Sequence, residues 1–190
     1  MAEGDRIRKR SMADLKNRMI RAAKLDANLY EEVEADQGAT GQALAVVVLS
    51  SVAAGIGTIS AGGVSGIVLG TLVTLAGWYV WAYVTYLIGT KLLPEPQTEA
   101  DLGQLLRTTG FASSPGLARL LGIIPGLIGI IFFLVSIWML VAMVIAVRQA
   151  LDYSGTARAI VVCAIGWLIQ AIILVLLLQI LGVPAVGLHG

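Results

Sequence analysis

The sequence has little of the side-chain chemistry that enzymes and metal proteins use. Its 190 residues include one cysteine, Cys163, and one histidine, His189. A disulfide framework and a cysteine-based metal site each need more than one cysteine, so both are excluded. Paired carboxylates, nucleophile–base sets and phosphate-binding loops are also missing from the apolar segments. We therefore predict no catalytic residue, no metal site, no cofactor and no enzymatic activity.

Charge is also scarce and unevenly placed. Charged residues make up 13% of the chain and hydrophobic residues 57%, whereas soluble domains carry about 25% charged residues. Eight of the 13 Lys and Arg residues fall in the first 24 positions, and the first aromatic residue is Tyr30. A basic segment without aromatic side chains to stack on bases is a poor nucleic-acid site, so we predict no nucleic-acid partner.

What the chain does have is long apolar runs, at Ala43 to about Ile59, Gly62–Leu93, Leu127–Val147 and Ala159–Leu181. A helix needs roughly 20 apolar residues to cross a hydrocarbon layer of about 30 Å. The runs predict an all-α, polytopic transmembrane helical bundle that contacts the lipid bilayer. We divide the chain into a cytosolic N-terminal helix and linker (1–42), a transmembrane domain (43–183) and a short tail (184–190).

The segment Gly62–Leu93 carries two further patterns. Glycines at every fourth position, Gly62, Gly66 and Gly70, share one helix face and predict close helix packing, within the chain or in a homo-oligomer. Aromatic side chains and one lysine follow, and we predict that they anchor the helix at the membrane–water boundary, although the rings could instead line a ligand groove. These anchor residues are Trp78, Trp81, Tyr83, Tyr86 and Lys91.

The polar residues outside these runs predict the remaining local structure. Residues 5–36 have helical spacing and predict one amphipathic helix, which lies on an anionic membrane surface or is solvated by its own ion pairs. The glycine-rich stretch Ser60–Ser65 predicts a short turn. Thr98 is predicted to cap a short helix, with Asp101 three residues further on.

Residues 111–124 decide the topology. If this segment crosses the membrane, the chain has five spans, the third short or partly re-entrant, and all Lys and Arg residues that flank the spans lie on one side. If it does not, the chain has four spans and the Arg148–Arg158 loop lies opposite the basic N-terminus. The positive-inside rule favours five spans, with Arg119 snorkelling or bound to a partner such as Asp101.

Several short motifs resemble the Yip-one family of Ypt/Rab-interacting membrane proteins, in its bacterial branch. They are Asn28–Glu34, Tyr86–Gly89, Gly110–Pro115, Ile137–Trp138 and Arg148–Ala150. The resemblance implies five transmembrane helices, a cytosolic N-terminus and a bacterial inner-membrane location. Eukaryotic members bind small GTPases in vesicle trafficking, but their Asp-Leu-Tyr-Gly-Pro-type element is replaced here by Asn28-Leu29-Tyr30-Glu31.

Three hypotheses for the function follow. The first is a non-enzymatic membrane scaffold or interaction protein, with an unknown membrane or cytosolic partner, in membrane organisation or trafficking. The second is a small transporter or channel, because polar residues such as Arg119, Ser136 and Gln170 lie in or near the spans. The third, a membrane enzyme, has only Asp101 and Asp152 as candidates, and both are isolated in loops.

Overall fold

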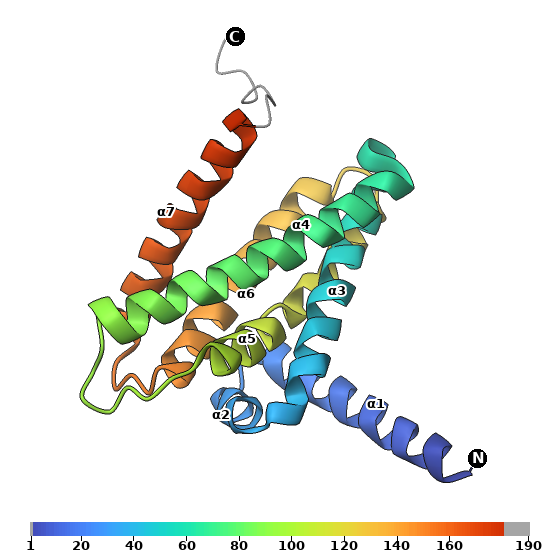
Figure 1. Ribbon diagram of the computed structural model, residues 1–190. Coiled ribbons are helices and arrows are strands. Elements are labelled where there is room, and N and C mark those ends of the chain that lie inside the picture. The colour runs from blue at the N-terminus through green and yellow to red at the C-terminus, as the bar shows by residue number, and fades with distance from the viewer. Residues whose placement is uncertain (1, 181–190) are drawn as a thin grey trace.

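The computed structural model describes residues 2–180, and among them the side chains of all but residues 2–11, 60–62, 174, 177, 178 and 180. Every regular element in this range is a helix (Figure 1). Four segments are long and apolar enough to cross a membrane: Gln37–Gly57, Gly63–Leu92, Ile128–Ala150 and Thr156–Ile173. These agree with the four apolar runs of the sequence. The predicted tail, 184–190, lies outside the described residues.

The N-terminal segment forms two helices, so the prediction of one continuous helix was wrong. Helix α1 (Ala2–Ala23) ends before Leu25, whose φ of 63° is left-handed. The carboxylate of Asp26 then accepts a hydrogen bond from the Asn28 N–H and caps α2 (Ala27–Ala35). Backbone N–H groups are free only at the start of a helix, and the Asp26 carboxylate satisfies one of them. The cap therefore favours a new helix at this point over a continuous one. The acidic half of the segment can therefore reach back to the basic half.

The first pair of long helices is joined more tightly than the sequence indicated. A 3₁₀ turn, η1 (Gln37–Ala39), leads into α3 (Thr40–Gly57), and α4 (Ile59–Leu87) begins one residue after α3 ends. Residues 60–62 of the predicted turn are helical, and the backbone breaks at Gly63, with φ 59° and ψ −166°. Only glycine adopts this conformation without strain, so the break falls there. A π-helical turn, η2 (Ile88–Leu92), extends α4 toward the loop of residues 93–101.

A short capped helix follows this loop. Helix α5 (Leu102–Phe111) begins at Asp101, which forms a capping box with Gln104. The predicted cap, Thr98, instead donates a hydrogen bond to the Leu151 carbonyl. The threonine therefore makes a tertiary contact, and the aspartate caps the helix in its place.

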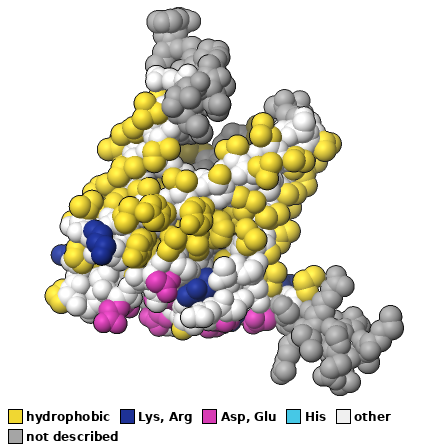
Figure 2. All heavy atoms as spheres, in the orientation of Figure 1, with side chains coloured by type: hydrophobic (Ala, Val, Ile, Leu, Met, Phe, Trp, Pro, Cys, Tyr) yellow, Lys and Arg dark blue, Asp and Glu magenta, His cyan; other side chains and the backbone are white. Residues whose placement is uncertain are grey.

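The rest of the chain runs away from the charged residues along one segment, returns along the next, and runs away again along the last. A 3₁₀ helix, η3 (Ser114–Ile123), packs between α3 and α6 (Ile128–Ala150), and α7 (Thr156–Ile180) contacts α4 and α6. In Figure 1, α7 and α4 lie close at their lower ends and diverge above. Figure 2 shows hydrophobic side chains over this upper part and charged side chains along the lower edge.

Two apolar clusters hold the lower part of the bundle together. One joins α2, α3, α5 and α6 around the buried residues Leu29, Tyr30 and Phe111. The other joins α4, α5, α6 and α7 around Trp81, Leu105 and Leu151. We call this part the charged end; it comprises α1, α2, α5, the loops of residues 93–101 and 151–155, and the adjoining ends of α3, α4, α6 and α7.

Candidate functional site

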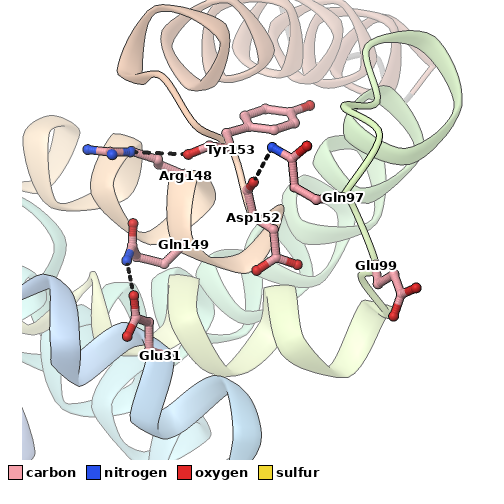
Figure 3. A pocket seen from close by; sticks show the side chains of 7 residues that line it. All are labelled: Glu31, Gln97, Glu99, Arg148, Gln149, Asp152 and Tyr153. Carbon is pink, nitrogen blue, oxygen red and sulfur yellow. Dashed lines mark hydrogen bonds between the residues drawn. The ribbon is translucent and has the colours of Figure 1, made fainter.

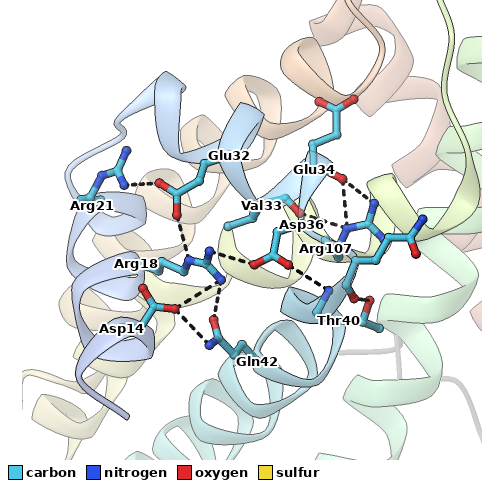
Figure 4. Close-up of polar contacts among 12 residues, drawn as sticks. Asp14, Arg18, Arg21, Glu32, Val33, Glu34, Asp36, Thr40, Gln42 and Arg107 are labelled. Carbon is cyan, nitrogen blue, oxygen red and sulfur yellow. Dashed lines mark hydrogen bonds and ion pairs between the residues drawn. The ribbon is translucent and has the colours of Figure 1, made fainter. Parts of the chain in front are cut away.

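An ion-pair cluster ties α1 to α2 at the charged end (Figure 4). The Arg18 side chain is 10% exposed, and its guanidinium lies 2.9 Å from carboxylate oxygens of both Glu32 and Asp36. It also donates to the side-chain oxygen of Gln42, at the start of α3. Burial alone would raise the pKa of Glu32, but hydrogen bonds from Arg21 and Arg18 lower it. One buried cation thus links three helices.

A second arginine holds α2 against the membrane domain. The Nε of Arg107, on α5, donates to the carbonyl oxygens of Val33 at 2.9 Å and Glu34 at 3.1 Å. These carbonyls belong to the last turn of α2, where a cation also interacts favourably with the helix dipole. Arg107 is 6% exposed. The N-terminal segment is therefore docked on the bundle through buried contacts.

A polar pocket of about 620 Å³ opens beside this docked helix (Figure 3). Its walls come from α2, the 93–101 loop, the end of α6 and the α6–α7 loop, and they are lined by Glu31, Gln97, Glu99, Arg148, Gln149, Asp152 and Tyr153. The lining thus contains three carboxylates and one guanidinium. Such a lining favours ligands that present positive charge and hydrogen-bond donors.

Hydrogen bonds fix the pocket walls to one another. Gln149 donates to a carboxylate oxygen of Glu31 at 2.7 Å, and Gln97 donates to the Asp152 carbonyl at 3.0 Å. The Tyr153 hydroxyl donates to the Leu93 carbonyl at 2.7 Å. The Arg148 guanidinium is held by the Tyr153 and Ser154 carbonyls. The pocket is thus built before any ligand enters it.

Glu34 lies in the same acidic surroundings. Burial raises the pKa of its carboxyl group to about 7, and the negative charges of Asp152, Glu31 and Asp101 add to the shift, against the lowering effect of Arg107. This carboxyl group therefore changes its charge near neutral pH.

The predicted packing glycines lie elsewhere. A methyl group placed on Gly66 or Gly70 would meet no other atom of the described structure within 4 Å, so these two glycines do not pack against another helix of the chain. Gly62 lies in α4, but the side-chain surroundings at residues 60–62 are not described. Helix packing through this face stays a prediction, now for contacts between copies.

The predicted anchors divide into two groups. Trp81 is 4% exposed and packs inside the bundle, and the Trp78 indole N–H donates to the Thr109 hydroxyl. Tyr83 and Lys91 are exposed, and Tyr86 is half-buried. Trp81 is therefore not placed to touch the lipid boundary, whereas the anchor role stays a prediction for the exposed residues.

The short motifs of the sequence meet at the charged end. Glu31, in the first motif, accepts the hydrogen bond of Gln149, in the last, across 118 positions of the chain. The Gly89 carbonyl, which ends the second motif, accepts a hydrogen bond from Tyr153. Phe111, in the third, is fully buried against α2 and α3. Residue spacing alone could not find Arg18, Arg107 or the pocket, but the motifs marked several of their neighbours.

Comparison with known families agrees with this arrangement. The family model of the Yip1 domain matches residues 27–178, about four-fifths of the chain. The chain belongs to the Yip1 family. No curated protein and no solved structure gives a significant match. As a Yip1-domain protein with four span-length apolar helices, it is a multi-pass integral membrane protein that contacts the lipid bilayer.

Proposed function

We propose that this Yip1-family protein is a non-enzymatic interaction or scaffold protein of the membrane, with its charged end in the cytosol. In that role it would organise or sort membrane components, and we place it in a bacterial inner membrane. The observation that carries the proposal is the preformed polar pocket beside the docked helix α2. A surface of this kind, held rigid by buried contacts, is suited to a protein partner.

The proposed topology has five crossings, with α5 and η3 as the third. Along α3, Ala43 lies next to Gly110, Ser50 next to Gly116, and Gly57 next to Arg119 and Gly122. The two segments therefore advance in the same direction over the same depth. A 3₁₀ helix rises about 2.0 Å per residue against 1.5 Å in an α-helix, so a short segment covers more depth. This accounts for a third crossing below the usual length.

The topology also gives Arg119 a place inside the bundle. Its guanidinium lies 3.3 Å from the Ser136 hydroxyl and 5.4 Å from the centre of the Phe132 ring. A cation in a membrane segment is costly unless such partners accompany it. With five crossings, the flanking residues Lys91, Arg107, Arg148 and Arg158 all share the cytosolic side.

The pocket lining indicates the chemistry of the partner. Three carboxylates against one guanidinium favour a segment that carries Lys or Arg side chains. Because the pocket is open to water, the association should weaken as salt concentration rises.

A comparison of affinity purifications tests this proposal. The tagged protein is purified from its native membranes as wild type, as the double variant Glu31→Gln/Asp152→Asn, and as Asp14→Asn, a loss of charge at an exposed position outside the pocket lining. We expect a partner that copurifies with the wild type and with Asp14→Asn, and whose amount falls at least tenfold in the double variant. Identical sets of proteins from all three forms, measured by quantitative mass spectrometry, would refute the role of the pocket.

One feature supports the second candidate function, a small transporter or channel. Trp81 Nε1, Thr85 Oγ1 and Gln170 Oε1 are buried between α4 and α7 and have no hydrogen-bond partner among the described residues. Unpaired polar groups at membrane depth commonly mark a path for a polar solute. Solute flux into reconstituted vesicles, lost in Gln170→Leu and Arg119→Ala, would favour transport over the interaction role.

A further inference from the structure

An apolar groove of about 370 Å³ lies between α1, η3 and α6, apart from the polar pocket. Its walls are almost entirely hydrocarbon, with Lys16 and Ser114 as the two polar side chains, and its lining includes Leu15, Met19, Pro115 and Trp138. The volume lies at the lower end of the range of about 300–1,000 Å³ that small-molecule sites occupy.

Helix α1 presents different residues to its two neighbours. Arg18 and Arg21 point to the carboxylates of α2. Met12, Lys16, Met19 and Ala23 recur at helical spacing on another face and line the groove. Arg18 and Arg21 are thus paired with carboxylates of the protein, while Lys16 lies beside the apolar groove.

Two contacts define the groove from the bundle side. The Trp138 indole N–H donates to the Ala23 carbonyl at 2.8 Å and joins the end of α1 to α6. The Ser114 side chain is 3% exposed and lines the groove, and its hydroxyl has no hydrogen-bond partner among the described residues. A buried hydroxyl without a partner costs free energy, which an acceptor brought in by a ligand would recover.

We propose that this groove binds one anionic phospholipid, with an acyl chain along the apolar walls, the phosphate beside Lys16, and an ester oxygen accepting a hydrogen bond from Ser114. The proposal rests on the membrane placement of the proposed function. The exposed side chains of Leu120, Leu121 and Ile137 continue the apolar surface from η3 and α6. In that placement they face lipid, so an acyl chain reaches the groove from the bilayer without crossing water.

Charge explains the preference for an anionic headgroup. The first 24 residues hold eight Lys and Arg residues against three acidic ones, Glu3, Asp5 and Asp14. A positively charged segment at a membrane surface gains about 1 kcal/mol for each basic residue near anionic lipid. Among these basic residues, Lys16 lines the groove itself. An acyl chain bound in the groove would hold the phosphate of the same lipid close to Lys16.

Native mass spectrometry of the full-length protein tests the site. The protein is taken from mixed micelles that contain equal amounts of phosphatidylglycerol and phosphatidylcholine. We expect the wild type to retain one phosphatidylglycerol per chain, and Ala118→Trp, which fills the groove, to retain at least tenfold less. The matched variant Ala76→Trp, on an exposed position of α4, should retain lipid as the wild type does. Equal retention by all three forms would overturn the proposal.

The headgroup contact has its own variants. Lys16→Gln should reduce the preference for phosphatidylglycerol over phosphatidylcholine several-fold, whereas Lys24→Gln, at an exposed position outside the groove lining, should leave it unchanged. Ser114→Ala should lower retention of both lipids. If Lys16→Gln and Lys24→Gln have the same effect, the helix attracts lipid only by its overall charge and the site is refuted.

A second measurement does not depend on a bulky substitution. Trp138 lines the groove, so brominated phosphatidylglycerol should quench its fluorescence with saturation. The Trp138 signal is the difference between the wild type and Trp138→Phe. Quenching that rises in proportion to bromolipid, without saturation, would indicate bulk lipid and contradict the proposal. Neither result alters partner capture by the polar pocket, so failure of this site and failure of the proposed function are separable.

Discussion

The charged end and the far half of the bundle are held together by different means. At the charged end, Arg18, Arg107 and Tyr30 are buried and bonded across helices, and both apolar clusters lie there. In the far half, α4 leaves large apolar side chains exposed, such as Val64 at 72% and Leu69 at 64%. Apolar side chains gain nothing by leaving lipid, so helices there need close backbone contact instead of apolar packing. The protein is thus rigid where polar chemistry operates and sparsely packed elsewhere.

The tightest glycine-to-backbone approach of the described residues is at Gly57 in the far half, and its loss should have the largest effect. A methyl group on Gly57 would clash with the Arg119 carbonyl oxygen, which is backbone and cannot rotate away. We expect Gly57→Ala to separate α3 from η3 and to destabilise the protein by about 3 kcal/mol. Unfolding in a denaturing detergent series measures this. A loss below that of Gly41→Ala, where a methyl group meets nothing within 4 Å, would contradict the close contact.

The next largest effect should come from the charged end. Arg107→Ala leaves the Val33 and Glu34 carbonyls without their buried donor, at an expected cost of about 2 kcal/mol. Limited proteolysis should then cleave between α2 and α3 faster. Arg158→Ala is the comparison, because its side chain is 42% exposed and pairs with Glu95 at the surface, where such pairs contribute about 0–1 kcal/mol. Equal losses in the two variants would show that docking of α2 does not depend on Arg107.

A smaller effect depends on pH. Burial raises the pKa of Glu34 to about 7 in the folded protein, from its ordinary value of 4.5. The folded state therefore holds this proton more tightly, and stability falls as pH rises from about 4.5 to 7. After allowance for its partial exposure, Glu34→Gln should remove about 1 kcal/mol of this pH dependence.

Thermal midpoints of the wild type and of Glu34→Gln, at pH 5 and pH 8, measure the pH dependence that Glu34 causes. Glu95 gives the opposite sign, because the backbone N–H of Ser154 lowers the pKa of its carboxyl group. Its contribution is present above pH 4.5 and is lost as pH falls below that value. A wild type and a Glu34→Gln variant with the same pH profile would exclude a buried, titrating Glu34.

The smallest effect on folding is expected on the open face of α4. A methyl group on Gly70 meets nothing, and alanine favours a helix over glycine by about 1 kcal/mol at most. Gly70→Ala should leave the thermal midpoint unchanged or slightly raised. If this face joins two copies, Gly70→Leu should abolish the homo-oligomer seen by crosslinking in membranes, while the monomer stays folded. A large loss of monomer stability in Gly70→Ala would show that the glycine packs within the chain.

The sequence was informative where one physical factor decides the outcome. Segment length and apolarity located α3, α4, α6 and α7, because crossing a membrane requires both. It was uninformative about which face of α4 turns inward, because that helix is apolar all round. Trp81 was therefore predicted at the lipid boundary and lies inside the bundle.

Local signals failed where tertiary contacts competed with them. Asp26 and Asp101 both cap helices. Helical spacing instead predicts Asp26 inside one continuous helix and Asp101 as the partner of Thr98. The pocket joins residues as distant as Glu31 and Gln149, and only the fold brings them together. The short family motifs contained both residues, so they pointed toward the site without revealing its geometry.

Cysteine labelling in intact cells tests the central claim, that the charged residues flanking the spans share one side. In a Cys163→Ser background, Ile124→Cys and Ser154→Cys place one thiol at each end of α6, both at exposed positions. Five crossings predict that a membrane-impermeant maleimide labels Ile124→Cys from outside, and Ser154→Cys only after the membrane is opened. The reverse pattern would mean four crossings and contradict the account.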